Sequence, residues 1–181
     1  MEITTKRTLP ILLVLSWIIF VGVCIEAGGF IVNAFFALVN PDVVKHLWHE
    51  ADLSALLQYS TGYFFAEMLL MGVVAVLKAW LFYLIIKILH DKNFNLAQPF
   101  NREVRRFIFN IACLTFIIGL FSWWGVKYTG WLTRQGVALP DVQDLRLGGA
   151  DVWLFMSVVL FVIGQIFKRG VEIQAENELT I

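Results

Sequence analysis

The chain has 181 residues, of which 59% are hydrophobic and 15% are charged, and its formal net charge is zero. Soluble globular domains contain about 45–50% apolar residues. This composition therefore excludes an ordinary soluble domain and indicates a membrane protein, while the net charge says nothing about partners.

Four apolar segments reach or approach the length of about 20 residues that a helix needs to cross a bilayer core. They are residues 9–38, 63–89, 107–126 and 150–167. The sequence thus predicts an all-α, polytopic membrane protein, with a four-transmembrane-helix bundle as its single domain over residues 1–181. Residues 168–181 are expected to form a cytoplasmic tail.

Lysine and arginine are concentrated on one side of the predicted bundle. That side holds Lys6, Arg7, Lys87, Lys92, Arg102, Arg105, Arg106, Lys168 and Arg169. Because cytoplasmic loops carry an excess of these residues, we expect a multi-pass protein of the cell inner (plasma) membrane with both termini in the cytoplasm.

The segment after the first span predicts a short amphipathic helix in the first outer loop. Pro41 suits a helix start, and the apolar residues that follow recur at helical spacing. His46, His49 and Glu50 share the other side of this helix, at a spacing that allows side chains to share a metal. The order of these residues is not that of a zincin motif. A solvated helix face is the preferred interpretation, and an outer-face metal or ligand sensor remains an alternative.

Glu26 is the most informative polar residue, because a carboxylate within a span costs about 2.5–3.5 kcal/mol on insertion scales and rarely faces lipid. Gly22, Glu26, Gly29 and Asn33 recur at helical spacing, so this stripe of the first span is expected to face the other helices.

The second span contains Glu67 and Lys78, eleven residues apart. The two residues lie nearly on one helix face but about three turns apart, so they cannot pair directly. Counting from the span ends places Glu26 slightly outside the midplane and Lys78 slightly inside it, an offset that a lysine side chain can bridge, which predicts a Glu26–Lys78 ion pair. Three interpretations stay open: a pair that fixes helix register, a proton or ion relay through Glu67, Lys78 and Glu26, or a lysine that extends to the inner interface without pairing.

The predicted inner face combines a basic loop with an acidic tail. Asn101 is expected to cap a helix that begins with Arg102, Arg105 and Arg106. Gly170 marks a break after the fourth span. The tail beyond it, with Glu172 and Glu176, is expected either to fold back onto the basic loop or to remain a solvated, frayed terminus.

No motif supports enzyme chemistry. The chain has no glycine-rich phosphate loop and no nucleophile elbow, and its serines and cysteines within spans have no base beside them. Haem ligation across the bilayer core would need histidines inside the spans, and there are none. We therefore expect a non-enzymatic protein without a cofactor.

The last third of the chain resembles the signature end of the domain-of-unknown-function family 2975, which comprises small bacterial membrane proteins with four predicted spans. The family pattern G-x-E-x-Q-x-E-N-x-L-T is matched at Gly170, Glu172, Gln174, Glu176, Asn177, Leu179 and Thr180. The inner-loop stretch PFNREVRRF also resembles the family's PF pair before a basic helix, although the residues after Asn101 match loosely.

This resemblance implies no established activity. Genes of the family often lie beside one for a small helix-turn-helix regulator, which implies by association a membrane protein that tethers or controls such a regulator. We therefore predict a regulatory or interaction role at the inner face, with the lipid bilayer as a further partner and no direct nucleic-acid binding. The alternative is a small transporter or channel that uses Glu26, Glu67 and Lys78. The oligomeric state is left open.

Overall fold

A computed structural model describes residues 2–40, 52–90 and 100–178 of the chain. The elements are α1 (Glu2–Val39), α2 (Ser54–Tyr59), α3 (Thr61–His90), α4 (Arg102–Arg134) and α5 (Ala150–Glu178), and no strand occurs in the described ranges. Four of these helices are long and apolar enough to cross a membrane. The prediction of an all-α fold with four transmembrane helices is confirmed.

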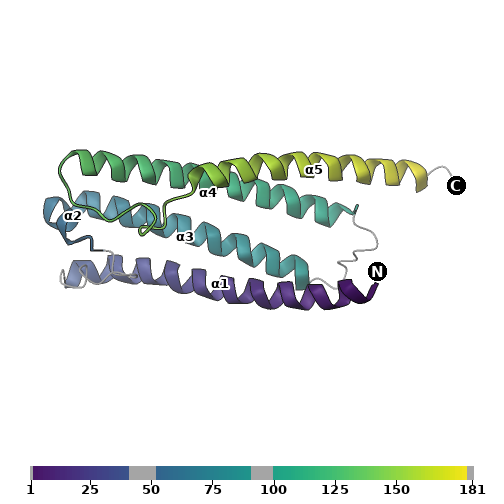
Figure 1. The fold of residues 1–181 in the computed structure, drawn as a ribbon, viewed down its shortest axis with the longest axis horizontal. Coiled ribbons are helices and arrows are strands. Elements are labelled where there is room, and N and C mark those ends of the chain that lie inside the picture. The colour runs from purple at the N-terminus through teal and green to yellow at the C-terminus, as the bar shows by residue number, and fades with distance from the viewer. Residues whose placement is uncertain (1, 41–51, 91–99, 179–181) are drawn as a thin grey trace.

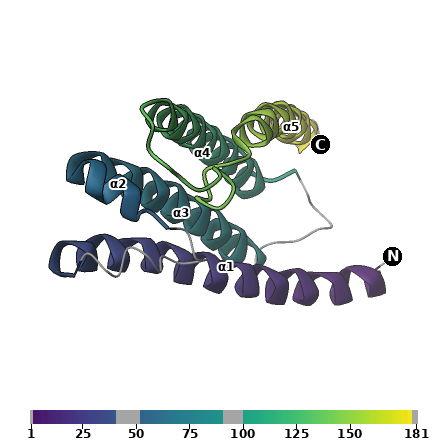
Figure 2. The same ribbon diagram turned by 60° about the vertical axis from the view of Figure 1, so that its left-hand side comes forward.

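The long helices pack in the order of the chain (Figures 1 and 2). α1 lies against α3, α3 against α4, and α4 against α5, whereas α1 contacts neither α4 nor α5 within the described ranges. The buried face of α1 is formed by Ala27, Phe30 and Ala37. The predicted stripe through Gly22 and Glu26 lies at the edge of that face, because Gly22 is exposed and Glu26 is partly buried.

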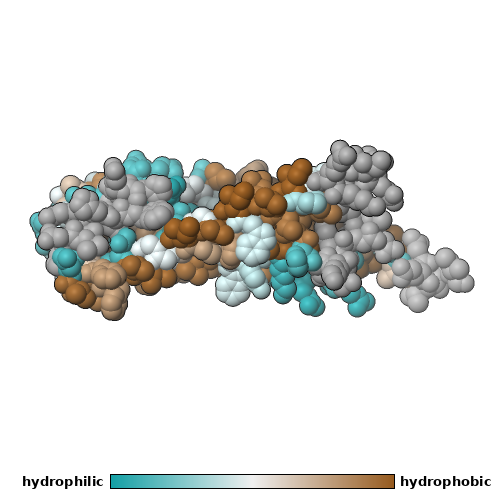
Figure 3. All heavy atoms as spheres, turned by 90° about the horizontal axis from the view of Figure 1, so that it is seen from below, coloured by the Kyte–Doolittle hydropathy of each residue, from teal (hydrophilic) through white to brown (hydrophobic). Residues whose placement is uncertain are grey.

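Apolar side chains cover the outside of this row of helices. Figure 3 shows them over the middle of one face, with hydrophilic residues toward its ends. Large apolar side chains such as Ile18, Ile31 and Phe35 are exposed on α1. Only 6% of the most apolar stretch of this helix is buried within the protein. A surface of this kind is stable only where acyl chains or other apolar groups replace water. The protein is thus a multi-pass membrane protein.

The fourth long helix, α5, does not start level with the end of α4. Figure 1 shows α5 starting about halfway along α4 and ending beyond the start of α4. Ring contacts fix this antiparallel register, with centroids 6.1 Å apart for Phe109 and Phe161 and 5.3 Å apart for Phe100 and Phe167. The loop of residues 135–149 must therefore run back along the helices to reach the start of α5, and it carries Leu145 into the core with no exposed surface.

Residues 41–51, which hold most of the predicted amphipathic helix, lie outside the described ranges. The described part of that connection contains the short helix α2, which packs against α3 through the fully buried Leu56. The metal candidates His46, His49 and Glu50 also lie outside these ranges. Within the part that the structure describes, no group of three His, Cys, Asp or Glu residues is placed to hold a metal ion.

Candidate functional site

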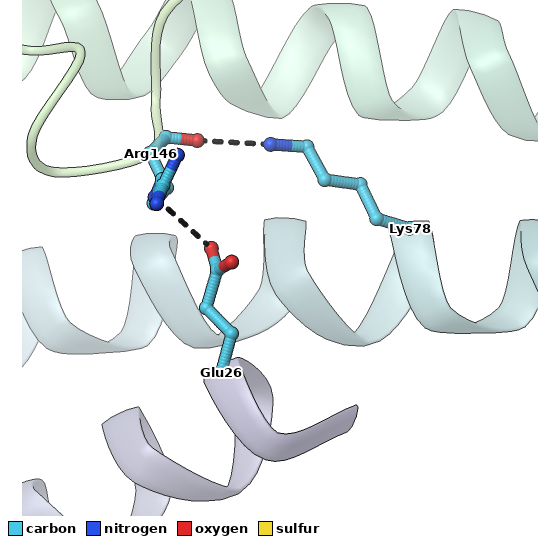
Figure 4. Close-up of polar contacts among 3 residues, drawn as sticks. All are labelled: Glu26, Lys78 and Arg146. Atoms are coloured by element: carbon cyan, nitrogen blue, oxygen red, sulfur yellow. Dashed lines mark hydrogen bonds and ion pairs between the residues drawn. The ribbon is translucent and has the colours of Figure 1, made fainter. Parts of the chain in front are cut away.

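Three charged residues meet, one each from α1, α3 and the loop of residues 135–149 (Figure 4). Lys78 on α3 donates a hydrogen bond from Nζ to the backbone carbonyl oxygen of Arg146, at 3.0 Å. The Nε of Arg146 lies 3.8 Å from Oε1 of Glu26 on α1. We call Glu26, Lys78 and Arg146 the charged triad.

The triad corrects the predicted direct pair between Glu26 and Lys78. The two side chains do point toward one region, but there Arg146 contacts both of them. Arg146 was missed because it belongs to the polar segment before the fourth span, which was interpreted as an outer loop. The signal that could have found it is the alternation of Leu145, Arg146 and Leu147, in which two apolar residues flank one charge.

The loop conformation explains how Arg146 reaches this depth. A tight turn forms where the carbonyl of Val142 accepts hydrogen bonds from the amides of Leu147 and Gly148, at 3.0 and 3.1 Å. Leu145 and Leu147 are fully buried on either side of Arg146. Arg146 itself has φ 59°, in the left-handed region that non-glycine residues rarely adopt. Lys78 binds the carbonyl of this strained residue, so it anchors the loop.

Lys78 makes a second contact with the start of α5. Its Nζ lies 5.9 Å from the centre of the Trp153 ring, within the range of a cation–π interaction. One lysine therefore joins α3 both to the returning loop and to the first turn of α5.

Replacing Lys78 by methionine is expected to loosen the loop of residues 135–149 without unfolding the helices. A hydrogen bond from a charged donor contributes about 1.5–3 kcal/mol, so amide hydrogen exchange at residues 143–148 should accelerate by about 10- to 100-fold. Exchange measured by mass spectrometry in detergent micelles tests this. Lys87→Met, an exposed lysine further along α3, is the control and should leave loop exchange unchanged. Equal exchange in both variants would show that Lys78 does not anchor the loop.

Glu67 belongs to a separate polar site between α3 and α4. Its side chain is completely buried, and its Oε1 accepts a hydrogen bond from the Thr129 hydroxyl at 2.6 Å. The same hydroxyl also lies 2.9 Å from the carbonyl oxygen of Gly125. Among the described residues, Glu67 Oε2 and the buried Ser122 hydroxyl have no hydrogen-bond partner. The predicted relay residues Glu67 and Lys78 are therefore held by different partners.

Thr129 was not predicted, although the sequence holds a signal for it. The buried face of α4 contains a stripe of small and hydroxyl residues at spacings of three and four. These are Thr115, Gly119, Ser122, Gly125 and Thr129. Such a stripe is typical of a helix that lies close to its neighbours in a membrane, and it identifies the face of α4 on which a partner for Glu67 is found. The fourth predicted polar residue of the spans, Asn33, is partly buried on α1.

The basic segment at the start of α4 forms as predicted. Oδ1 of Asn101 accepts a hydrogen bond from the backbone amide of Val104 at 2.7 Å, which caps the helix. Arg102 and Arg106 are exposed, while Arg105 is partly buried.

The predicted break at Gly170 is wrong, because α5 continues as one helix to Glu178. Gly170 allows a close approach instead: a Cβ there would collide with the ring of Phe100. Glu172 pairs with Arg169 of its own helix, with 3.3 Å between Oε2 and Nη1. Gln174 is partly buried and Glu176 is exposed. The side chain of Asn177 lies outside the described residues.

One of three comparisons with known proteins found a match. A family model described as "Protein of unknown function (DUF2975)" matches residues 55–181, which include α2, α3, α4 and α5. Searches of curated proteins and of solved structures found no match. Since the matched region covers well over half of the chain, the protein belongs to the DUF2975 family of proteins of unknown function.

Proposed function

We propose that the protein has a non-enzymatic regulatory or interaction role in the bacterial inner membrane, and that the end of α5 binds a cytoplasmic partner protein. The observation that carries this proposal is the extension of α5 beyond the start of α4 (Figure 1). A helix that ended level with the start of α4 would offer a partner no surface of its own. The end of α5 instead extends beyond that level, up to Glu178.

The chemistry of this extension suits a basic partner. Glu172 and Glu176 lie one turn apart, and Ile173 between them is 46% exposed. Acidic residues around an apolar anchor attract and orient a positively charged surface. DNA-binding regulators carry such surfaces. The family resemblance implies a helix-turn-helix regulator, and we propose one as the partner.

The orientation required by this proposal follows from the charge distribution. The end of the bundle where α3 stops and α4 starts carries Lys87, Arg102 and Arg106, and an excess of basic residues favours the cytoplasmic side. The extension of α5 lies at the same end (Figure 1). Both termini are thus proposed to be cytoplasmic.

Removing the two acidic charges of the extension should weaken partner binding. For Glu172→Gln/Glu176→Gln we expect a Kd on the order of tenfold higher, because two lost charge pairs at an interface rim are together worth up to about 2 kcal/mol. The measurement uses full-length protein in nanodiscs and a purified helix-turn-helix regulator encoded beside a gene of this family.

The matched control is Asp141→Asn/Asp144→Asn, which removes two exposed carboxylates from the loop of residues 135–149. Its Kd should equal that of the native protein. The proposal fails if both double variants and a chain lacking residues 171–181 bind the regulator as the native protein does, or if the native protein does not bind it.

A transporter or channel is the second candidate, favoured by the buried carboxyl group of Glu67 and by the charged triad. Intramembrane ionisable groups mark ion or proton pathways in many membrane proteins. Flux across proteoliposomes under a pH gradient tests this candidate. Equal rates for native protein and Glu26→Gln would remove that carboxylate from the mechanism.

A further inference from the structure

A cavity of about 380 Å³ opens between the last turns of α3 and the first turns of α4. Three basic side chains line it: Lys87 from α3, and Arg102 and Arg106 from α4. Among the described residues that line it, Glu103 alone is acidic. The cavity therefore has an excess of positive charge.

The three cations form no ion pair among the residues that the structure describes, although Glu103 lines the same cavity. The ion pairs found there join other residues, and all three basic side chains are exposed. Arg102 and Arg106 are one turn apart at the N-terminus of α4, where the helix dipole already favours an anion and disfavours cations. A bound anion would relieve both the dipole and the mutual repulsion of the two guanidinium groups.

The cavity continues as an apolar groove toward the middle of the helices. Leu84 and Asn110 line both the basic cavity and a second cavity of about 350 Å³. The second cavity is further lined by Trp80 of α3 and Ile117 of α4, both of which are exposed. The two cavities thus adjoin at Leu84 and Asn110, and together they make a groove along α3 and α4 that is basic at the helix ends and apolar deeper in.

We infer that this groove binds an anionic phospholipid, with its phosphate group at Lys87, Arg102 and Arg106 and an acyl chain along Trp80 and Ile117. The groove is basic at one end and apolar at the other, and a lipid likewise has a charged headgroup at one end and hydrocarbon chains at the other. Basic pockets between transmembrane helices bind anionic headgroups in this way. A soluble phosphate compound would use only the basic part, which leaves the apolar groove without a ligand.

The inference is independent of the proposed partner at the end of α5. Its residues are carried by α3 and α4, whereas the partner site rests on Glu172 and Glu176 of α5. Variants of one site can therefore be tested while the other is intact.

The experiment measures lipid retention by the full-length protein. Native protein in detergent is mixed with equal amounts of phosphatidylglycerol and phosphatidylcholine, and the lipids that remain bound are counted by native mass spectrometry. We expect native protein to retain phosphatidylglycerol preferentially. In Lys87→Gln/Arg102→Gln/Arg106→Gln this preference should fall on the order of 100-fold, since each basic side chain near an anionic lipid contributes about a fivefold factor.

The charge-matched control is Lys127→Gln/Arg134→Gln/Lys168→Gln, which removes three exposed cations outside the groove and should keep the preference. Glu103→Gln is a second variant, useful if the triple variant unfolds, and it should raise phosphatidylglycerol retention. Equal retention of the two lipids by native protein, equal losses in both triple variants, or no gain in Glu103→Gln would each overturn the inference.

Two further arms separate a lipid from a free anion. Inorganic phosphate at millimolar concentration should not displace phosphatidylglycerol, and displacement would assign the site to a soluble anion. Phosphatidylglycerol with brominated acyl chains should quench native fluorescence more than it quenches Trp80→Phe fluorescence. Equal quenching would place the acyl chain elsewhere and overturn the inferred groove.

Discussion

Replacing Gly119 by alanine is expected to force α4 and α5 apart and to destabilise the bundle by about 1–3 kcal/mol, the usual cost of overpacking. A Cβ at this position would lie 2.8 Å from Cγ and Cδ2 of Leu154 and 3.1 Å from the Leu154 backbone nitrogen. A side chain can move away by changing its rotamer, but the backbone of α5 cannot. Separating the two helices would also shift Trp153, and with it one contact of Lys78. The loss should appear as a lower midpoint in unfolding of the purified protein in mixed micelles by sodium dodecyl sulfate.

Gly130→Ala is the matched control, because it makes the same chemical change in the same helix. A Cβ at Gly130 would have no heavy atom from another described part of the fold within 4 Å. Alanine in a helix interior is more favourable than glycine by roughly 0.5–1 kcal/mol, so the control should match or slightly exceed native stability. If Gly119→Ala were as stable as Gly130→Ala, the close approach of α4 and α5 at Leu154 would be refuted.

The contrast between these two glycines illustrates what the sequence revealed of the fold. Apolar length alone located the four spanning helices, because bilayer thickness sets the number of residues that each requires. It did not reveal where α5 starts beside α4, since hydropathy carries no information on the register between neighbouring helices. That register depends on close contacts such as Gly119 with Leu154 and Gly170 with Phe100. Gly170 was interpreted as a helix end, because glycine occurs both at helix ends and where two helices approach closely.

The polar residues divide in the same way. Counting along the spans placed Glu26 and Lys78 close enough in depth for a lysine side chain to bridge the offset, and the cost of burying their charges required partners for them. The partner that both residues contact is Arg146, and its position depends on how the loop of residues 135–149 folds back, which the sequence did not reveal. For Glu67 the partner was Thr129 on another span. The stripe of small and hydroxyl residues marks the face of α4 on which Thr129 lies, but it does not say which residue of α3 that face meets.

Replacing Thr129 by valine is expected to destabilise the protein by about 1–2 kcal/mol, the range given by model studies for hydrogen bonds between membrane helices. Valine has nearly the shape of threonine but lacks the hydroxyl that binds Oε1 of Glu67. The substitution leaves both carboxyl oxygens of a completely buried side chain without a protein partner among the described residues. Such groups carry a desolvation cost that nothing offsets. Glu67→Gln keeps the size of the side chain and can still bond to Thr129, so it should lose less stability than Thr129→Val.

A double-mutant cycle separates this hydrogen bond from general packing effects. In a Glu67→Met background the buried carboxyl group is gone, so Thr129→Val should cost little further stability. The coupling energy between the two positions is then close to the whole cost of the single Thr129→Val change. Thr133→Val is the control on the same helix, because its hydroxyl bonds to the Thr129 backbone carbonyl, at 3.0 Å, and its residue is exposed. If Thr129→Val cost the same stability in the Glu67→Met background, the threonine would stabilise α4 only through its contact with the Gly125 carbonyl. The Glu67 carboxyl group would then have a role other than joining α3 to α4.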